Sequence, residues 1–423
     1  MTETHYSYLV NQAIARRNND AHINKTLQES LTLDSSHDSI QHLEVLAQDI
    51  KMINDHIKVD VSIFGEASFD YEGIAKKLVE KLHWPNESIR IVPQGSVSTK
   101  TLIRAPDNSK FDIDAVCSVD LSMIEVNDPM DFYNKVGCAL EEWDPEPRRR
   151  CWKVDFKGRR YYIEFTPSTP LDKVPQSADS NITYFPSPRY SNKALAVVDT
   201  PTKQWKTSNP EGFSSWVNDQ SSRPLLRWLQ EGSKQYNYSA DSVLPVPEQG
   251  VEISDTLRVA IRLLKRHRDM SVRRNYIEPN FKPISIIIVT LLTQCYEGLA
   301  DKGAFYSHPI ELLIDLVELM PHMVERRGNE YWIANPTVLG ENFAEKWNEN
   351  PKLKHSFDIW TGLLLEDLNK IIASTEINSR RQLIMQVFGC TANQNPPTSP
   401  NEIGLTSIKP TKAHKAPPTK GLA

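Results

Sequence analysis

One stretch of the chain, residues 89–116, limits the possible folds more than any other. Residues 89–92 read IRIV and residues 111–116 read FDIDAV, and both runs predict β-strands. Between them lie the turn Gln94–Ser96 and a polar segment that contains Pro106. This order places a turn with a permissive backbone next to a strand that carries two acids.

The residue types in this stretch have a definite chemistry. Gly95 allows the backbone to approach a ligand closely, and a helix that starts at Ser96 would offer free N–H groups to an anion. Residues two apart on a strand face the same side, so Asp112 and Asp114 point together. Adjacent carboxylates repel each other unless a cation lies between them, and Mg²⁺ is the usual cation. A phosphate cradle beside a carboxylate metal site is typical of an enzyme that handles nucleotides.

A hairpin later in the chain supplies a third acid. Residues 151–156 and 161–166 predict two strands joined by a turn that contains Gly158. Glu164 is the one acid in the second, otherwise apolar strand, and Asp155 on the first strand is its rival. We favour Glu164 because it lies in a pattern of apolar, acidic, apolar and polar residues that ends in proline.

Asp112, Asp114 and Glu164 together form the candidate catalytic and metal-binding set. Three carboxylates on one face can hold two Mg²⁺ ions about 4 Å apart, which suits the transfer of a phosphoryl or nucleotidyl group. The alternative is an ordinary exposed strand edge, since a DxD sequence by itself is a weak signal.

Composition excludes several other classes of protein. A length of 423 residues indicates two or more domains, and a net charge of -5 argues against a protein that stably binds long nucleic acid. Five cysteines without a CxxC pair fit free thiols in a reducing compartment. The N-terminus does not read as a signal peptide, and the longest apolar run, residues 284–292, is well short of the ~20 residues of a membrane span. We therefore expect a cytoplasmic protein without a membrane segment.

Patterning along the chain divides it into four parts. Residues 1–36 predict a helix or a partly ordered arm, and residues 37–205 the domain that contains the acidic strands. Within that domain, residues 168–204 are rich in Pro, Ser and Asn, which favours an extended connection. Residues 206–394 are mostly helical in pattern, whereas the Pro- and Lys-rich residues 395–423 predict a disordered tail.

The helical part contributes two further candidate residues. An apolar stripe and an adjoining basic stripe follow one helix: Leu257, Ala260, Ile261 and Leu264, then Arg258, Arg262 and Lys265. Lys265 borders both stripes, so we expect it at a domain edge, the alternative being a solvated surface lysine. Ser285 follows Pro283 in the first turn of an apolar helix, where it either faces a ligand or caps the helix.

As a set, these motifs resemble the polymerase-β-type nucleotidyltransferase superfamily. More narrowly, the chain resembles the bacterial cyclic GMP–AMP synthase/DncV-like nucleotidyltransferases, the CD-NTases of anti-phage CBASS systems. The resemblance covers roughly residues 40–390. Its segments are Gln94–Ser96, Asp112–Asp114, Cys151–Trp152, Ile163–Pro167, Asn209–Phe213, Leu263–Arg268 and Lys282–Ile287.

The resemblance implies an α+β fold, with a mixed-sheet nucleotidyltransferase lobe, a helical C-terminal lobe and the active site between them. It implies an enzyme that uses Mg²⁺ or Mn²⁺ to make a cyclic di- or trinucleotide messenger from ATP, GTP or other NTPs, with release of pyrophosphate. The alternatives are a linear nucleotidyltransferase that acts on RNA, a protein or a small molecule, and a catalytically silent nucleotide-binding relative.

Site residues follow from the resemblance position by position. Asp112, Asp114 and Glu164 would bind the metals, and Glu164 would also orient the attacking hydroxyl. The triphosphate would be held by Gln94, Gly95, Ser96, Lys265 and Ser285.

The chain departs from the family pattern at two positions. Glu164 stands where the family usually has Asp, and Lys100 stands where many relatives have Gly. Lys100 either contacts a phosphate or faces solvent. The segments 335–337 and 341–343 resemble a family segment near the base pocket, although by their residues alone they form a loop that enters a helix.

The end of the chain suggests a partner. It reads TKGLA, and some relatives have their C-terminus joined to a target by ubiquitin-like conjugation enzymes. Such enzymes would accept an extended terminus of small residues at Ala423; the alternative is an unselected end.

Overall fold

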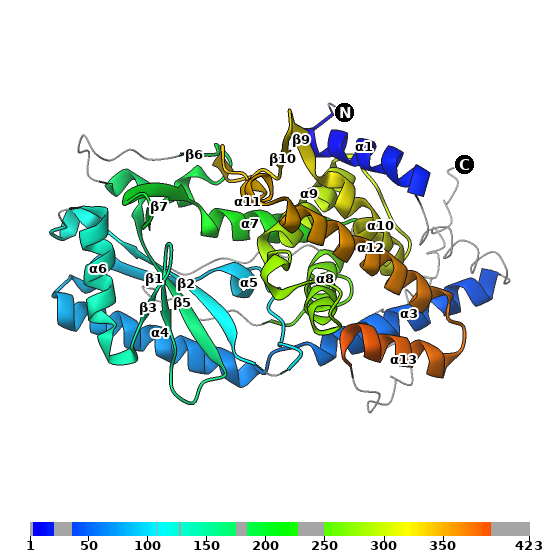
Figure 1. The fold of residues 1–423 in the computed structure, drawn as a ribbon, viewed down its shortest axis with the longest axis horizontal. Coiled ribbons are helices and arrows are strands. Elements are labelled where there is room, and N and C mark those ends of the chain that lie inside the picture. Colours follow the sequence, from blue (N-terminus) through cyan, green and yellow to red (C-terminus); the bar gives the residue numbers. More distant parts are fainter. Residues whose placement is uncertain are drawn as a thin grey trace, which may run out of the picture.

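A computed structural model describes residues 3–20, 36–107, 109–126, 128–174, 184–226 and 249–390. It has a sheet-containing lobe and a helical lobe, which lie side by side in Figure 1. The predicted disordered tail, 395–423, lies outside the described residues.

The sheet lobe is built on seven strands in the order β1-β2-β5-β4-β3, with β7 paired to β5 and β8 paired to β7. The pair β2–β5 is parallel and every other pair is antiparallel, so the sheet is mixed, as expected. The bounds are β1 Ile89–Pro93, β2 Phe111–Val119, β3 Glu146–Pro147, β4 Trp152–Val154, β5 Tyr161–Pro170, β7 Leu195–Asp199 and β8 Gln204–Ser208.

Two helices, α4 (Val61–Leu82) and α6 (Pro129–Ala139), share an apolar core with this sheet. Phe132 of α6 contacts the rings of Trp84 and Trp205, at centroid distances of 5.8 and 5.7 Å. This core covers one face of the sheet through Ile113 and Ala115 of β2, so the aspartates of β2 lie on the other face.

The helical lobe surrounds α9 (Ser285–Asp301), whose residues are buried nearly all round. Helices α1, α7, α8 and α10 pack against it. The remaining helix bounds are α1 His5–Asp20, α3 Ser36–His56, α5 Gly95–Ser98, α7 Pro210–Ser221, α8 Thr256–Arg273, α10 Pro309–Leu319, α11 Glu345–Glu349, α12 Pro351–Ala373 and α13 Ile377–Phe388.

Two N-terminal segments belong to the helical lobe by their contacts. Helix α1 packs against α9 and buries Leu9 and Val10, so this part of the predicted arm is an ordered helix. Helix α3 buries Leu46 against Ile310 and Ile314 of α10. The expected boundary at residue 37 therefore differs from the observed packing, because the apolar face of α3 matches the helices and not the sheet.

Several short strands were not predicted. β7 and β8 lie inside or just after the expected extended connection, whose residues 175–183 lie outside the described chain. β6 (Phe185–Pro186) pairs with β11 (Val338–Leu339), and β9 (Glu325–Arg327) pairs with β10 (Glu330–Trp332) in a region expected to be helical. Runs of two to five residues flanked by Pro, Ser and Gly have too little periodicity to identify a strand. No helix in the described ranges has the length and apolar character to cross a bilayer.

Candidate active site

The candidate carboxylates meet on one face of the sheet. In the parallel pair β2–β5, Asp112 lies opposite Tyr162 and Asp114 lies opposite Glu164. Because directly paired residues share a face and alternate residues share a side, all four side chains lie on the same face. Ile113, between the two aspartates, is fully buried on the other face.

Nearby cations offset this concentration of negative charge only in part, since the pKa values of Asp114 and Glu164 stay raised. Burial, and then the charges of Asp112 and Glu164, raise the pKa of Asp114 to about 8. Burial and then Asp112 also raise the pKa of Glu164. No described residue forms an ion pair with any of the three carboxylates. The arrangement therefore favours an added cation.

The three carboxylates do not form a complete metal cage. Among the described residues, no group of three or more His, Cys, Asp or Glu side chains is arranged to hold a metal ion by itself. Mg²⁺ commonly binds through one or two carboxylates together with substrate phosphates and water. The donor chemistry fits such a shared site, with the remaining ligands supplied by a nucleotide.

The glycine-serine turn lies directly against the second aspartate. Gly95 has φ +62°, and a Cβ atom built there would lie 2.0 Å from the Oδ2 atom of Asp114. The backbone N–H of Gln94 donates to the Asp114 carbonyl at 2.9 Å, and its side-chain Nε2 donates to Thr166 Oγ1 at 3.3 Å. The helical turn α5 begins at Gly95, one residue before the predicted start at Ser96. Glycine is therefore required here both by φ and by space.

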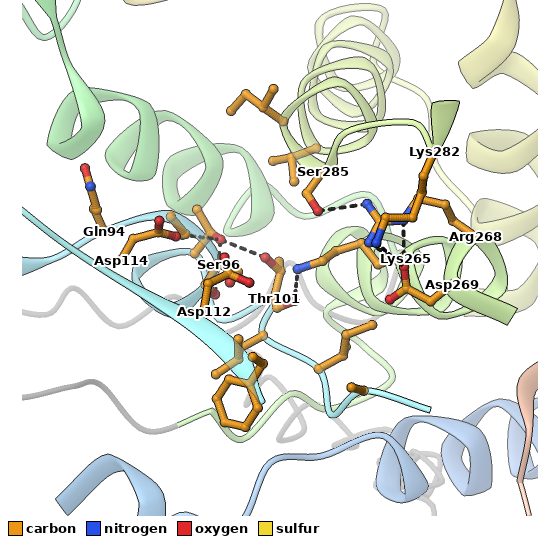
Figure 2. A pocket seen from close by; sticks show the side chains of 18 of the residues that line it. Gln94, Ser96, Thr101, Asp112, Asp114, Lys265, Arg268, Asp269, Lys282 and Ser285 are labelled. Atoms are coloured by element: carbon orange, nitrogen blue, oxygen red, sulfur yellow. Dashed lines mark hydrogen bonds and ion pairs between the residues drawn. The ribbon is translucent and has the colours of Figure 1, made fainter. Parts of the chain in front are cut away.

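A cavity of about 990 Å³ joins the two lobes at this point. Seven of the eight candidate residues line it: Gln94, Gly95, Ser96, Asp112, Asp114, Lys265 and Ser285. Glu164 is not among the lining residues, and its connection to the site is its position opposite Asp114. Figure 2 shows the aspartates on one side of this cavity and Lys265 with Ser285 on the other.

Lys265 is buried at the lobe edge and is not a solvated surface lysine. Its side chain is 5% exposed, and Nζ donates to the carbonyl oxygen of Thr101 at 2.9 Å. Burial, and then the charge of Arg268, lower the pKa of Lys265 to about 8. A phosphate placed beside it would favour the charged ammonium.

Ser285 does not act as the helix cap. The N-cap of α9 is Ile284, which makes no side-chain cap bond. Ser285 Oγ accepts from Arg268 Nη1 at 2.9 Å, and Arg268 also pairs with Asp269 at 2.8 Å. Lys282 lies 3.4 Å from the same aspartate. Ser285 is thus part of a charged cluster that faces the cavity.

Sequence reasoning assigned no role to Arg268, Asp269 and Lys282, although all three line the cavity. Two signals were available. Arg268 follows Lys265 by three residues on α8, so both lie on one helix face, and Lys282 closely precedes Ser285.

The segment after β10 also reaches the cavity, through Asn335, Glu341 and Phe343. Glu341 accepts a hydrogen bond from Asn335 Nδ2 at 2.7 Å. The residue pattern alone indicated a loop, and only the family resemblance pointed to a pocket.

The structure also gives the surroundings of Asp155 and Lys100, for which the sequence left alternatives open. Asp155 forms an ion pair with Lys110, and its side chain is 47% exposed, away from the paired position that Glu164 occupies. Lys100 has φ +58°, which explains a preference for glycine at this position, and it is not among the cavity-lining residues.

Comparisons with known proteins identify relatives of this fold. No protein-family model matches the chain. A curated c-di-GMP synthase from Roseivirga ehrenbergii is 25% identical over 340 residues, which are 78% of this chain and 81% of that protein. The solved CD-NTase CdnG of Bradyrhizobium diazoefficiens, in complex with GTP, superposes with a TM-score of 0.56 at 17% identity and covers 82% of this chain and 95% of that one. The chain has the CD-NTase fold.

The recognition of this chain as a CD-NTase-like nucleotidyltransferase, made from its motifs, is thus confirmed. A second CD-NTase structure, the E. coli CdnC:HORMA-deltaN complex, has a TM-score of 0.50 at 14% identity and covers 80% of this chain and 95% of that one. These CD-NTase matches span nearly the whole length of the solved chains, so the shared fold includes both lobes.

Proposed function

We propose that this chain is a cyclic oligonucleotide synthase, which joins NTPs into a cyclic di- or trinucleotide and releases pyrophosphate. The observation that carries the proposal is one cavity that brings Asp112 and Asp114, the Gly95 turn and Lys265 together. The likeness to a curated c-di-GMP synthase over most of both chains supports it and makes GTP the first substrate to test.

In the proposed reaction, a 3′- or 2′-hydroxyl of one nucleotide attacks the α-phosphorus of an NTP. A new P–O bond forms, the hydroxyl proton passes to Glu164 and from there to solvent, the bond between the α-phosphorus and the bridging oxygen breaks, and pyrophosphate leaves with that oxygen. A further transfer within the linear product closes the ring. The transition state of such a transfer requires alignment and charge more than covalent catalysis.

The chain's own residues would supply alignment and charge from both lobes. The Gln94–Ser96 turn would approach the triphosphate with its backbone, because Gly95 leaves no side chain in the way. Lys265 and Ser285 would contact the β- and γ-phosphates from the helical side. Glu164 would accept a hydrogen bond from the attacking hydroxyl and orient it.

Asp112, Asp114 and Glu164 would hold Mg²⁺ or Mn²⁺ together with phosphate oxygens of the nucleotide. When bound, the metal neutralises charge on the transferring and leaving phosphates. The raised pKa of Asp114 reflects how strongly burial, and then the charges of Asp112 and Glu164, disfavour its charged form.

The direct test is product analysis. Purified protein is incubated with Mg²⁺ or Mn²⁺ and labelled NTPs, singly and in mixture, and products are treated with phosphatase before chromatography and mass spectrometry. A phosphatase-resistant compound supports the proposal if its mass equals the sum of the joined nucleoside monophosphates minus one water for each linkage. A phosphatase-sensitive product would identify a linear nucleotidyltransferase, and no product with any NTP would identify a silent relative.

From the resemblance we also propose an anti-phage role in the cytoplasm and conjugation of the C-terminus at Ala423. Phage challenge of cells that carry the wild-type chain or its Asp112→Asn, Asp114→Asn variant tests the first. Mass spectrometry of the C-terminal peptide, after co-expression with neighbouring genes, tests the second; an unmodified Ala423 in every condition contradicts it.

A further inference from the structure

The segment Thr99–Pro106 connects the two catalytic elements of the sheet lobe. It follows α5, which begins at Gly95, and leads to β2, which carries Asp112 and Asp114. Apart from turns at its ends, the segment has no regular secondary structure. Its backbone carbonyls must therefore find hydrogen-bond donors elsewhere.

Helix α8 supplies those donors through its basic residues. The bonds run from Arg258 Nε to Thr99 O at 2.9 Å, Lys265 Nζ to Thr101 O at 2.9 Å, Arg262 Nη2 to Leu102 O at 3.3 Å, Arg266 Nη1 to Arg104 O at 3.1 Å and Arg273 Nη1 to Pro106 O at 3.1 Å. The basic stripe seen in the sequence thus faces the backbone of the other lobe.

Two of these donors, Lys265 and Arg262, differ in their other contacts. Lys265 lines the cavity, and among the described residues its side chain donates one hydrogen bond, to Thr101 O. Arg262 is 0% exposed, does not line the cavity, and also donates from Nη1 to Asn54 Oδ1 on α3 at 3.0 Å. Arg262 therefore ties the segment to the scaffold of the helical lobe, whereas Lys265 holds it by one bond that faces the ligand space.

A triphosphate in the cavity would compete for Lys265. A phosphate oxygen is a charged acceptor and forms a stronger hydrogen bond with an ammonium than a neutral carbonyl does. When Lys265 turns to a phosphate, Thr101 O loses its donor and the segment loses one of its attachments. The attachment through Arg262 does not depend on the cavity and remains.

We propose that Arg262 is a positioning residue for nucleotidyl transfer. It holds the segment Thr99–Pro106 against α8 while Lys265 leaves Thr101 for the triphosphate, which keeps the Gly95 turn and the Asp112–Asp114 strand aligned with the phosphates. This inference rests on the proposed function and deepens it at the same site.

The environment of Arg262 separates this role from simple stabilisation. No described acid forms an ion pair with its guanidinium, and its Nε has no hydrogen-bond partner among the described residues. Burial lowers its pKa to about 10, which shows that the charge is costly in this position. Arg262→Met removes this costly charge but also leaves Asn54 Oδ1 and Leu102 O without this donor, so turnover has to be compared with stability in the same variant. A loss of turnover without a loss of stability would therefore mark positioning.

The test compares Arg262→Met with Arg262→Lys and with a matched control, Arg380→Met. Arg380 is another buried arginine of the helical lobe, but it donates to Asp49 and the Ser374 carbonyl and contacts no atom of the segment. The measured quantities are kcat and KM for GTP and the other NTPs, the melting temperature, and amide hydrogen exchange of residues 99–106 with and without a non-hydrolysable NTP.

For Arg262→Met we expect kcat to fall by about 10- to 100-fold while KM for the NTP changes little, as misalignment predicts. Arg262→Lys should recover part of kcat, since one ammonium can replace one of the two bonds. Amide exchange in the segment should become faster than in the wild type once nucleotide is bound. Arg380→Met should keep kcat per folded molecule.

The proposal is overturned if Arg262→Met keeps wild-type kcat, if kcat falls only in proportion to folded protein as in Arg380→Met, or if exchange in the segment is unchanged. If Arg262→Met does not fold, Arg262→Lys, which can keep only one of the two bonds, provides the same readouts. A wild type that makes no cyclic product overturns the proposed function, and the exchange measurement with bound nucleotide still decides whether Arg262 positions the segment.

Discussion

The two sides of the cavity handle charge in opposite ways. On the sheet side, Asp112, Asp114 and Glu164 face no ion-pair partner among the described residues, and the pKa values of Asp114 and Glu164 are raised. On the helical side, the cations have partners: Lys265 bonds to Thr101 O, and Arg268 bonds to Ser285 and Asp269. The carboxylates of the sheet side thus lack ion-pair partners among the described residues. The cations of the helical side have acceptors that a phosphate could replace.

Because of this difference, we expect the two sides to contribute to different steps, catalysis and nucleotide binding. A pleated sheet fixes its side chains, so like charges can be held together until a cation joins them. Long Lys and Arg side chains on helices can exchange one acceptor for another without moving the backbone. Variants of the sheet-side carboxylates should therefore reduce turnover, and variants of the helical-side cations that line the cavity, such as Lys265, should change nucleotide affinity.

The largest effect is expected for Asp112→Asn combined with Asp114→Asn. Product formation should fall by at least about 10³-fold, since several kcal/mol of charge stabilisation depend on these carboxylates. The melting temperature should not fall, because the substitutions remove repulsion between neighbouring like charges. Asp155→Asn is the control, since Asp155 pairs with Lys110 outside this face. A double variant that still turns over NTPs would refute the assignment of the sheet side.

Gly95→Ala should cost about 10²-fold in turnover, because a Cβ atom 2.0 Å from Asp114 Oδ2 must displace that carboxylate. Gly158→Ala is a matched control: its φ of +79° imposes similar backbone strain, but nothing lies within 4 Å of the added atom. Turnover measured for both variants separates strain from displacement. Equal losses in the two would contradict the proposed contact between the turn and the carboxylate.

Lys265→Met should raise KM for the NTP by about 10- to 100-fold, the value of a hydrogen bond to a charged group, with a smaller change in kcat. The same variant should melt at a higher temperature, because it removes a charge that burial disfavours. Steady-state kinetics and thermal unfolding measure the two effects. If kcat fell more than KM rose, the division of work between the two sides would be wrong.

The smallest effect is a pH dependence. The pKa of Lys265 is lowered to about 8, so the free protein loses this ammonium as the pH rises through that value, and KM for the NTP should rise several-fold between about pH 7 and 9. Lys265→Arg should abolish the rise, since Arg keeps its charge. A rise that persists in Lys265→Arg would assign it to another group.

The same shift has a consequence for stability. Between about pH 8 and the usual lysine pKa of 10.5, the unfolded chain binds more protons at this position than the folded chain. This group therefore makes folding more favourable as the pH rises across that window, and its burial penalty is fully present below it. Thermal unfolding of wild type and Lys265→Met should converge with rising pH.

Sequence patterns predicted the direction of side chains within single strands and helices, because this direction depends on residues close in the chain. The alternation in β2 placed Asp112 and Asp114 on one face, and the apolar surroundings of Glu164 marked a buried strand, both as observed. The apolar and basic stripes of α8 were likewise visible as a helical period. Side-chain direction within one element is a local property, so the sequence determines it.

Only the tertiary structure decided which elements meet. The parallel register that sets Glu164 opposite Asp114, the packing of α3 on the helical lobe, and the contact of the α8 cations with Thr99–Pro106 all join segments distant in the chain. Such pairings are chosen by the burial and hydrogen-bond satisfaction of the whole molecule, and a one-residue change of register would reverse every side chain. The acidic residues were therefore evident in the sequence, whereas their convergence is a property of the fold.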